Sequence, residues 1–217
     1  MTLLEFARGP ALTWATVIFV AGMLWRSIGL MMMMRNKTLS KPRHENLSRG
    51  GWRLMLTRFV PAPVFRDKIA FQYVLGWIWH LGFVVVLFFF PLHILFFESI
   101  LGFAWPALPN GVIVFAGMVS AAILILLFVR RFIDPVLREI STFGDFAAVL
   151  VTALPFLTGL AAYGHLGLAY ETMLGLHFLS IALLLVWFPF SKLYHAVTVL
   201  PSRYILGVKF WRRGVDA

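Results

Sequence analysis

Five long apolar stretches dominate the sequence, and a polar or mixed segment separates each one from the next. A helix rises about 1.5 Å per residue, so about 20 apolar residues are needed to cross a hydrocarbon core about 30 Å thick. Each stretch has about that length or more. The pattern predicts an all-α integral membrane protein whose five transmembrane helices form a bundle, over residues 11–34, 71–100, 111–128, 146–163 and 172–200.

The composition supports this fold class and excludes several others. Hydrophobic residues make up 61% of the 217 residues and charged residues only 13%, with a mean hydropathy of +0.88. A soluble globular enzyme is therefore excluded, and a chain of this length is expected to form one domain, 1–217. The chain has no cysteine, so it cannot itself hold a disulfide, a cysteine-bound zinc ion or an iron–sulfur cluster.

Most of the cationic residues lie in alternate connections along the chain. Nine of them lie in the segment 35–70, and others follow the third stretch and the fifth, whereas residues 101–110 and 164–171 contain no lysine or arginine. The positive-inside rule then predicts an N-out, C-in topology in the cell's inner (cytoplasmic) membrane, with 35–70 as a basic cytoplasmic loop. The net charge of +10 thus reflects topology and membrane contact, and we expect no nucleic-acid partner.

The basic loop 35–70 has two interpretations. Its middle mixes arginines with large apolar side chains, Trp52, Leu54, Met55, Leu56 and Phe59. Such a segment is typical of an amphipathic stretch that lies on the cytoplasmic leaflet. The same residues also suit a docking surface for a peripheral subunit.

Four of the six histidines lie inside two predicted spans, His80 and His93 in the second and His177 and His195 in the fifth. An ionisable side chain in hydrocarbon is a functional hypothesis by default. No carboxylate is expected at the depth of His80 or His177, which argues against a proton relay or a cation transporter. Haem iron needs only neutral imidazole nitrogens, and two facing helices can supply one each.

The order of the spans decides which histidines can pair. The two helices run in opposite directions, so we expect His80 with His195 near the inner face and His93 with His177 near the outer face. On one continuous helix His177 and His195 are five turns apart, about 27 Å, and share a face.

The second span fits this arrangement less simply. On a straight helix His80 and His93 are about 140° out of register. Pro91 removes a backbone hydrogen bond and is expected to kink the helix, which would swing His93 onto the shared face. If His93 is not a ligand, His165 in the outer connection is its substitute.

Three segments resemble one known family. They are LHFLSIALLLVWFPFSKLYH at 176–195, VRRFIDPVLREISTFGDF at 129–146 and WHLGFVVVLFF at 79–89. Together they are similar to the gamma subunit of respiratory nitrate reductase, a dihaem membrane cytochrome b, and the likeness covers roughly residues 72–200. The family commonly places its second histidine of this span where the present chain has Phe90, three residues before His93.

Other differences from the nitrate reductase gamma subunit indicate a related cytochrome rather than that subunit itself. The first connection is longer and more basic, and the outer loop carries no lysine where the nitrate enzymes have one by the quinol site. The same cytochrome family serves heterodisulfide-reductase-like and sulfite-reduction-associated membrane complexes.

The resemblance implies a function for the chain as an electron-transfer subunit. It would hold two haem b groups and exchange electrons between menaquinone or ubiquinone and a cytoplasmic iron–sulfur subunit, within a complex that oxidises quinol or reduces quinone. Glu98 and Asn110 are the candidate quinone contacts on the outer side. Candidate cations for the haem propionates, each also explicable as a snorkelling residue, are Arg26, Arg35, Arg130, Arg131 and Lys192.

Two alternatives remain at this point. One alternative to the dihaem electron-transfer subunit is the gamma subunit of a nitrate reductase proper, and the other is a haem-free membrane anchor whose histidines make interhelical hydrogen bonds.

Overall fold

A computed structural model of the chain describes residues 1–33 and 41–215, and every regular element within them is a helix. Five of these helices are long and apolar enough to cross a membrane, which confirms the predicted number of spans among the described residues. They cover Leu3–Met32, Pro63–Phe89, Asn110–Ile133, Phe143–Tyr163 and Tyr170–Trp187.

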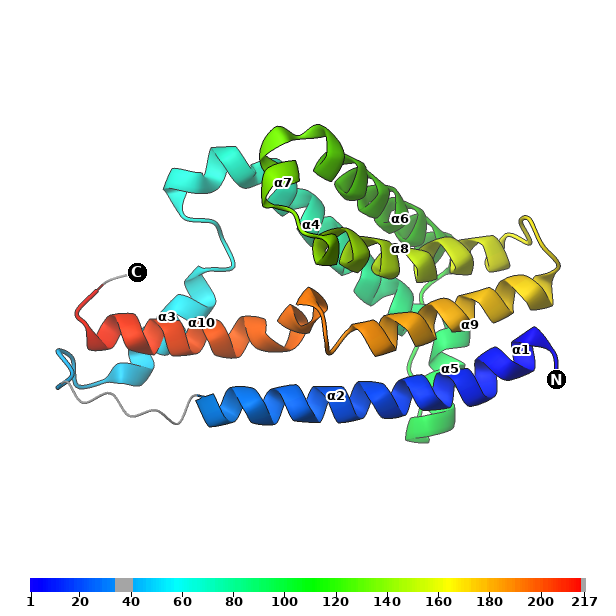
Figure 1. Cartoon of the computed structure of the whole chain (residues 1–217), viewed down its shortest axis with the longest axis horizontal. Coiled ribbons are helices and arrows are strands. Elements are labelled where there is room, and N and C mark those ends of the chain that lie inside the picture. Colours follow the sequence, from blue (N-terminus) through cyan, green and yellow to red (C-terminus); the bar gives the residue numbers. More distant parts are fainter. Residues whose placement is uncertain (34–40, 216–217) are drawn as a thin grey trace.

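The first span begins at Leu3 rather than at residue 11. It consists of α1 (Leu3–Phe6), a short π-helical segment η1 (Ala7–Ala11) that contains Pro10, and α2 (Leu12–Met33). The π turn accommodates the proline, which cannot donate a backbone hydrogen bond. These elements form one long rod along α9 (Tyr170–Trp187) (Figure 1). Met34, the predicted end, lies outside the described residues.

The second apolar stretch is two helices, so the prediction of one span over 71–100 is wrong. Helix α4 (Pro63–Phe89) begins eight residues earlier, Phe90 is extended, and α5 (Pro91–Leu101) follows. Pro91 is the cause, because it lacks an N–H group and its ring disfavours a helical conformation in the residue before it.

The break leaves carbonyl groups at the end of α4 without helical partners, and other parts of the chain bond to three of them. The His93 ring nitrogen Nδ1 lies 2.9 Å from the Val86 oxygen, and Trp105 Nε1 donates to the Phe88 oxygen at 2.6 Å. The Leu108 N–H donates to the Phe89 oxygen at 3.2 Å. The connection after α5 therefore folds back to stabilise the break.

The predicted fifth span over 172–200 is also broken. Helix α9 (Tyr170–Trp187) ends before the fully buried Pro189, and a 3₁₀ turn η2 (Lys192–Tyr194) leads into α10 (His195–Arg212). The separation of five turns expected between His177 and His195 therefore does not apply, because no continuous helix joins them.

The spans pack in a row in which α9 lies between α2 and α8. Helix α6 (Asn110–Ile133) packs against α4 on one side and α8 (Phe143–Tyr163) on the other, and the short α7 (Pro135–Ile140) follows α6. The core centres on Ala121, Leu124, Ala153 and Phe156 between α6 and α8. Helix α4 packs against α6 and α5 and has one buried residue, Gly82, so much of its surface is open.

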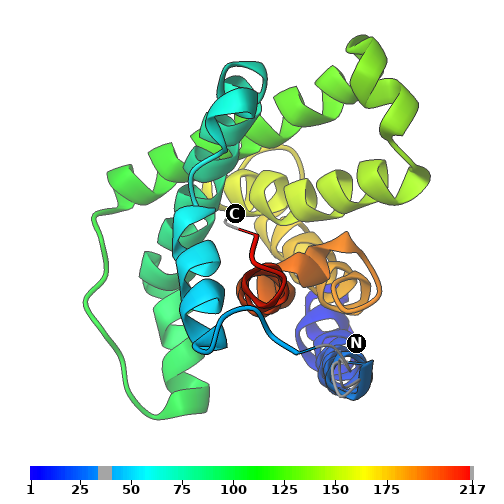
Figure 2. The same cartoon turned by 90° about the vertical axis from the view of Figure 1, so that its left-hand side faces the viewer.

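The basic loop contains a helix, α3 (Leu47–Thr57), which packs against α10 (Figure 2). Glycines permit the close approach: a Cβ atom on Gly207 would lie 2.8 Å from Leu54 Cβ, and one on Gly51 would lie 2.7 Å from Tyr204 Cδ2. The apolar face of α3 is thus covered by the chain's own α10. Residues 63–70, predicted as loop, belong to α4.

Replacing Gly207 with alanine tests this packing. We expect Gly207→Ala to destabilise the α3–α10 contact by about 1–3 kcal/mol, because the added methyl group has no room. Gly29→Ala on α2 is the matched control, since nothing lies within 4 Å of a Cβ atom there and alanine favours a helix. Trypsin should cleave the 41–62 segment faster in Gly207→Ala and at the wild-type rate in Gly29→Ala. Equal rates in all three proteins would contradict the contact.

Candidate functional site

The structure brings the four histidines of the predicted spans together as the two pairs that the span order predicts. The ring centroids of His80 on α4 and His195 at the start of α10 are 6.1 Å apart. Those of His93 on α5 and His177 on α9 are 6.3 Å apart. The spatial pairing is confirmed, whereas metal binding by these residues stays a prediction.

The first pair, His80 and His195, lies beside open space. Both residues are exposed, and their rings are nearly perpendicular, at 87°. His80 Nδ1 lies 2.6 Å from the Gly76 oxygen in the same helix, and His195 Nδ1 lies 2.9 Å from the Lys192 oxygen of η2. Each ring is therefore oriented by a backbone carbonyl near it in the sequence.

The second pair, His93 and His177, is half-buried, and its rings are nearly parallel, at 11°. His177 Nδ1 lies 3.2 Å from Thr158 Oγ1 on α8, and a Cβ atom on Gly159 would lie 3.0 Å from the His177 ring. His165 belongs to neither pair, because its ring lies against Tyr170 at 5.1 Å. Between the two sequence-based candidates, the structure places His93 opposite His177.

The break at Phe90 explains how His93 reaches this position. A continuous helix would leave His93 about 140° away from the face of His80. The new helix that starts at Pro91 changes the axis direction, and the bond from His93 to the free Val86 carbonyl then fixes its ring. The expected effect of Pro91 is confirmed, as a full break rather than a kink.

The centroid separations of the two pairs, 6.1 and 6.3 Å, are close to the separation of two imidazoles bound to one metal ion. A metal bound to two imidazole nitrogens at about 2.0–2.1 Å, each nitrogen about 1.1 Å from its ring centre, separates the centroids by about 6.2–6.4 Å. The hydrogen bonds of all four histidines use Nδ1, which leaves Nε2 as the nitrogen for a metal. Within residues 1–33 and 41–215, no three histidine or acidic side chains cluster around one point. Two protein ligands per site suit a metal whose other ligands come from a cofactor.

Arg26 lies beside the first pair and holds the break between α9 and η2. Its Nη1 donates to the Pro189 oxygen at 2.6 Å and to the Ser191 oxygen at 3.0 Å, and its guanidinium lies 4.4 Å from the centre of the Tyr194 ring. A cavity of about 440 Å³ opens here, and Arg26 and His195 are among the residues that line it. Arg26 is therefore placed to meet an anionic group next to His195.

The other candidate cations have different surroundings. Arg130 contacts Gln72 at 3.2 Å and Asp134 at 3.4 Å, and so links α6 to α4 and to the start of α7 rather than to a histidine. Lys192 forms an ion pair with Asp145 at 2.7 Å. Arg131 Nη1 lies 4.0 Å from the same carboxylate. Arg35 lies outside the described residues.

Asp134 is held in its charged form by the start of α7. The backbone N–H of Leu137, followed by that of Val136 and by the Arg130 guanidinium, lowers the pKa of Asp134 below its ordinary value. The carboxylate thus caps α7 and fixes the turn between α6 and α8.

The two quinone candidates, Glu98 and Asn110, are exposed at opposite ends of the connection between α5 and α6. In the described part of the chain, neither side chain makes a hydrogen bond or an ion pair. The structure therefore leaves both side chains open to a ligand without assembling a site around them.

One relative places the chain in a family. A protein of Nitratidesulfovibrio vulgaris (strain Hildenborough), described simply as "Protein", is 31% identical over 210 residues, which cover 94% of the present chain and 92% of the relative. The chain belongs to the same family as this protein. No protein-family model matches the chain, and no solved structure matches it.

Sequence reasoning missed the polar side chains that support the histidines. Thr158 and Ser180 lie next to His177, and Ser27 bonds to the Tyr194 hydroxyl at 2.8 Å. Their roles depend on which helices are neighbours, and no local pattern marks them. Trp105, which caps α4, lies in a connection whose fold the sequence does not specify.

Arg26→Gln tests the role of this arginine. The substitution removes the charged donor that serves the carbonyls of Pro189 and Ser191, so we expect a loss of about 2 kcal/mol in stability, measured as a lower melting temperature in detergent. Arg138→Gln is the control, because Arg138 is exposed and makes no side-chain bond among the described residues. A melting temperature unchanged in Arg26→Gln would show that the break is stable without it.

Proposed function

We propose that the chain is a dihaem b-type membrane cytochrome, in which His80 and His195 hold one haem and His93 and His177 hold the other. The observation that carries the proposal is the pair of facing imidazoles at each of two places, with centroid separations that suit an ion held between the rings. The cofactor supplies one-electron redox chemistry when it is bound, while the protein positions it and adjusts its potential.

The lack of cysteine decides the type of haem. Covalent attachment of a c-type haem needs cysteine thiols, and the chain has none. Two histidines per site without a thiolate are the ligand set of a non-covalently bound b haem. The Nδ1 bonds of the four histidines hold each ring in the tautomer whose Nε2 is free to bind iron.

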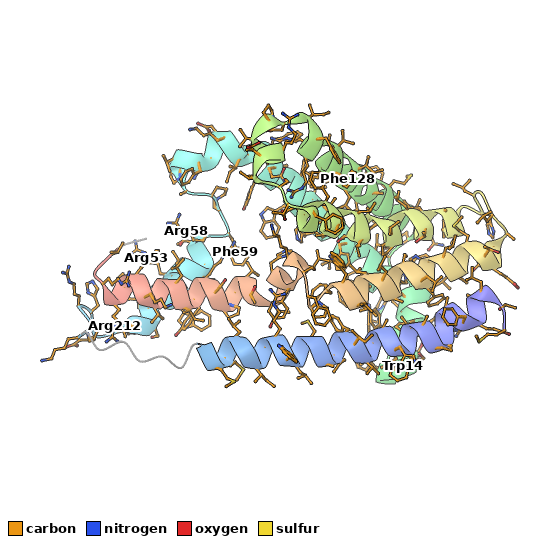
Figure 3. The ribbon with its side chains drawn as sticks, viewed as in Figure 1. Trp14, Arg53, Arg58, Phe59, Phe128 and Arg212 are labelled. Atoms are coloured by element: carbon orange, nitrogen blue, oxygen red, sulfur yellow. The ribbon has the colours of Figure 1, made fainter. Side chains whose placement is uncertain are left out.

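The arrangement of charge supports an N-out, C-in orientation and a cytoplasmic partner. The paired helices α3 and α10, with their flanking residues 41–62 and 195–215, carry nine cations and one acid, Glu45. Figure 3 shows Arg53, Arg58 and Arg212 gathered around this unit. Because the chain cannot hold an iron–sulfur cluster, we assign that centre to a peripheral subunit that docks on the basic α3–α10 unit in the cell's inner membrane.

Quinone exchange belongs at the opposite end in this proposal. Glu98 and Asn110 are exposed polar residues there, close in sequence to the α5 helix that carries His93. A quinol that releases protons needs an acceptor at its site, and Glu98 is a carboxylate suited to that role. The direction of electron flow and the choice of menaquinone or ubiquinone depend on the rest of the complex.

A haem-free anchor is the second candidate, because each of the four histidines already makes a hydrogen bond within the chain. The likeness of residues 72–200 to the nitrate reductase gamma subunit leaves that more specific role as another alternative. Co-purification of a molybdenum-containing nitrate reductase would favour it.

A pyridine haemochrome assay should find two b haems per chain. His177→Ala and His93→Ala should each lose the same haem, whereas His80→Ala and His195→Ala should each lose the other, because each pair shares one iron. His165→Ala is the control and should keep both. A wild-type protein without haem would rule out the cytochrome and leave the anchor.

The orientation predicts where reporters should appear. A fusion after Ala217 should be cytoplasmic, and an insertion near Asn110 should be external, because cations are absent from the outer connections. A cytoplasmic signal at Asn110 would invert the topology and, with it, the side on which we place the partner subunit.

A further inference from the structure

His177 differs from the other three histidines in the acceptor that its ring contacts. His80, His93 and His195 each direct Nδ1 to a backbone carbonyl oxygen. His177 Nδ1 instead lies 3.2 Å from the hydroxyl oxygen of Thr158, which is on the neighbouring helix α8. The ring also interacts with the Pro155 carbonyl of the same helix, so Thr158 is the part of its surroundings that can be replaced without altering the backbone.

The bonds around this hydroxyl fix the direction of the contact. Thr158 Oγ1 lies 2.7 Å from the Leu154 oxygen and is the donor in that bond. Ser180 Oγ, 3.1 Å from Thr158 Oγ1, donates its own hydrogen to the His177 carbonyl oxygen at 2.7 Å. A hydroxyl has a single hydrogen, so with both hydrogens in use Thr158 can only accept from His177. The His177 ring must then carry its proton on Nδ1.

The opposite tautomer would disturb this network. If the proton were on Nε2, Nδ1 would need a donor, and Thr158 would have to release the Leu154 carbonyl. The Leu154 oxygen would keep the helical bond from the Thr158 N–H but lose its second bond, inside a span where no water is at hand to replace it. Gly159 supports the same placement, because a side chain there would push the ring away.

We propose that Thr158 is a positioning residue that fixes the tautomer of His177 and sets the reduction potential of the metal bound to it. The proposal rests on the proposed function for its redox part only. An acceptor at Nδ1–H increases the electron donation of the imidazole to a metal, which stabilises the oxidised state. Loss of the Thr158 hydroxyl should therefore raise the potential of the His93–His177 haem and leave the other unchanged.

Thr158→Val is the decisive variant, with Thr158→Ser as the rescue and Thr152→Val as the matched control. Thr152 lies on the same helix and donates to the carbonyl four residues earlier at 2.7 Å, as Thr158 does, but within the described residues it makes no hydrogen bond to a histidine. Potentiometric titration should be done in a His195→Ala background, which retains only the haem of interest.

We expect Thr158→Val to favour the reduced state up to about tenfold, which equals about 59 mV for one electron. Thr158→Ser should restore the wild-type potential, and Thr152→Val should keep it. A potential that is unchanged in Thr158→Val, or raised equally in Thr152→Val, would overturn the proposal.

A second measurement does not depend on haem. Nitrogen NMR of histidine-labelled protein prepared without haem should show His177 as the Nδ1–H tautomer, with a mixture of tautomers in Thr158→Val. The His177 signal is identified by its loss in His177→Gln. An Nε2–H tautomer in the wild type would refute the role of Thr158 even if two haems bind. Absence of haem from the wild type, with the Nδ1–H tautomer present, would refute the cytochrome alone.

Discussion

The need to satisfy backbone carbonyls inside a membrane governs the arrangement of this protein. Where a helix stops among apolar side chains, its last carbonyl groups have little access to water, and the chain itself must supply the donors. Two spans stop in this way, at Phe90 and at Pro189, and a histidine lies just after each break. His93 and His195 direct Nδ1 to a carbonyl at or next to the break, so ring orientation and backbone satisfaction are achieved by the same contacts.

Small or polar residues of neighbouring segments lie beside each break, where they make room for it or bond to its carbonyl groups. Gly22 on α2 leaves room for Pro189, and Arg26, one turn later, bonds to the carbonyl of Pro189. At the other break Trp105 bonds to the end of α4. The two histidine pairs thus depend on residues from α2 and from the connection after α5, none of which is a proposed iron ligand.

The sequence predicts those parts of the structure that depend only on the order of the spans along the chain and on the depth of each residue within its span. Five spans and the pairing of His80 with His195 follow from the lengths of apolar stretches and the alternation of direction. The ends of the helices are harder to predict from the sequence, because apolar residues continue past Phe90 and Pro189 and the hydropathy pattern does not show the two breaks. Pro91 gives a readable signal, whereas the separate helix α10 and its packing on α3 arise from contacts between distant segments. Arg130 could not be assigned from the sequence for the same reason. Its place near the end of a span does not reveal that its guanidinium bonds to Gln72 and Asp134.

His195 is the first residue of α10, so any rotation of this helix also turns the His195 ring. The other end of α10 is packed closely against α3 through Gly207 and Gly50, while the 3₁₀ turn before His195 is a short joint. A helix of 18 residues is about 27 Å long, so a small rotation about that joint displaces its far end by several times more than its near end. Conversely, a displacement of α3 turns the His195 ring through only a small angle, while the bond from Tyr73 on α4 to the Phe59 carbonyl ties the same segment to the helix that carries His80.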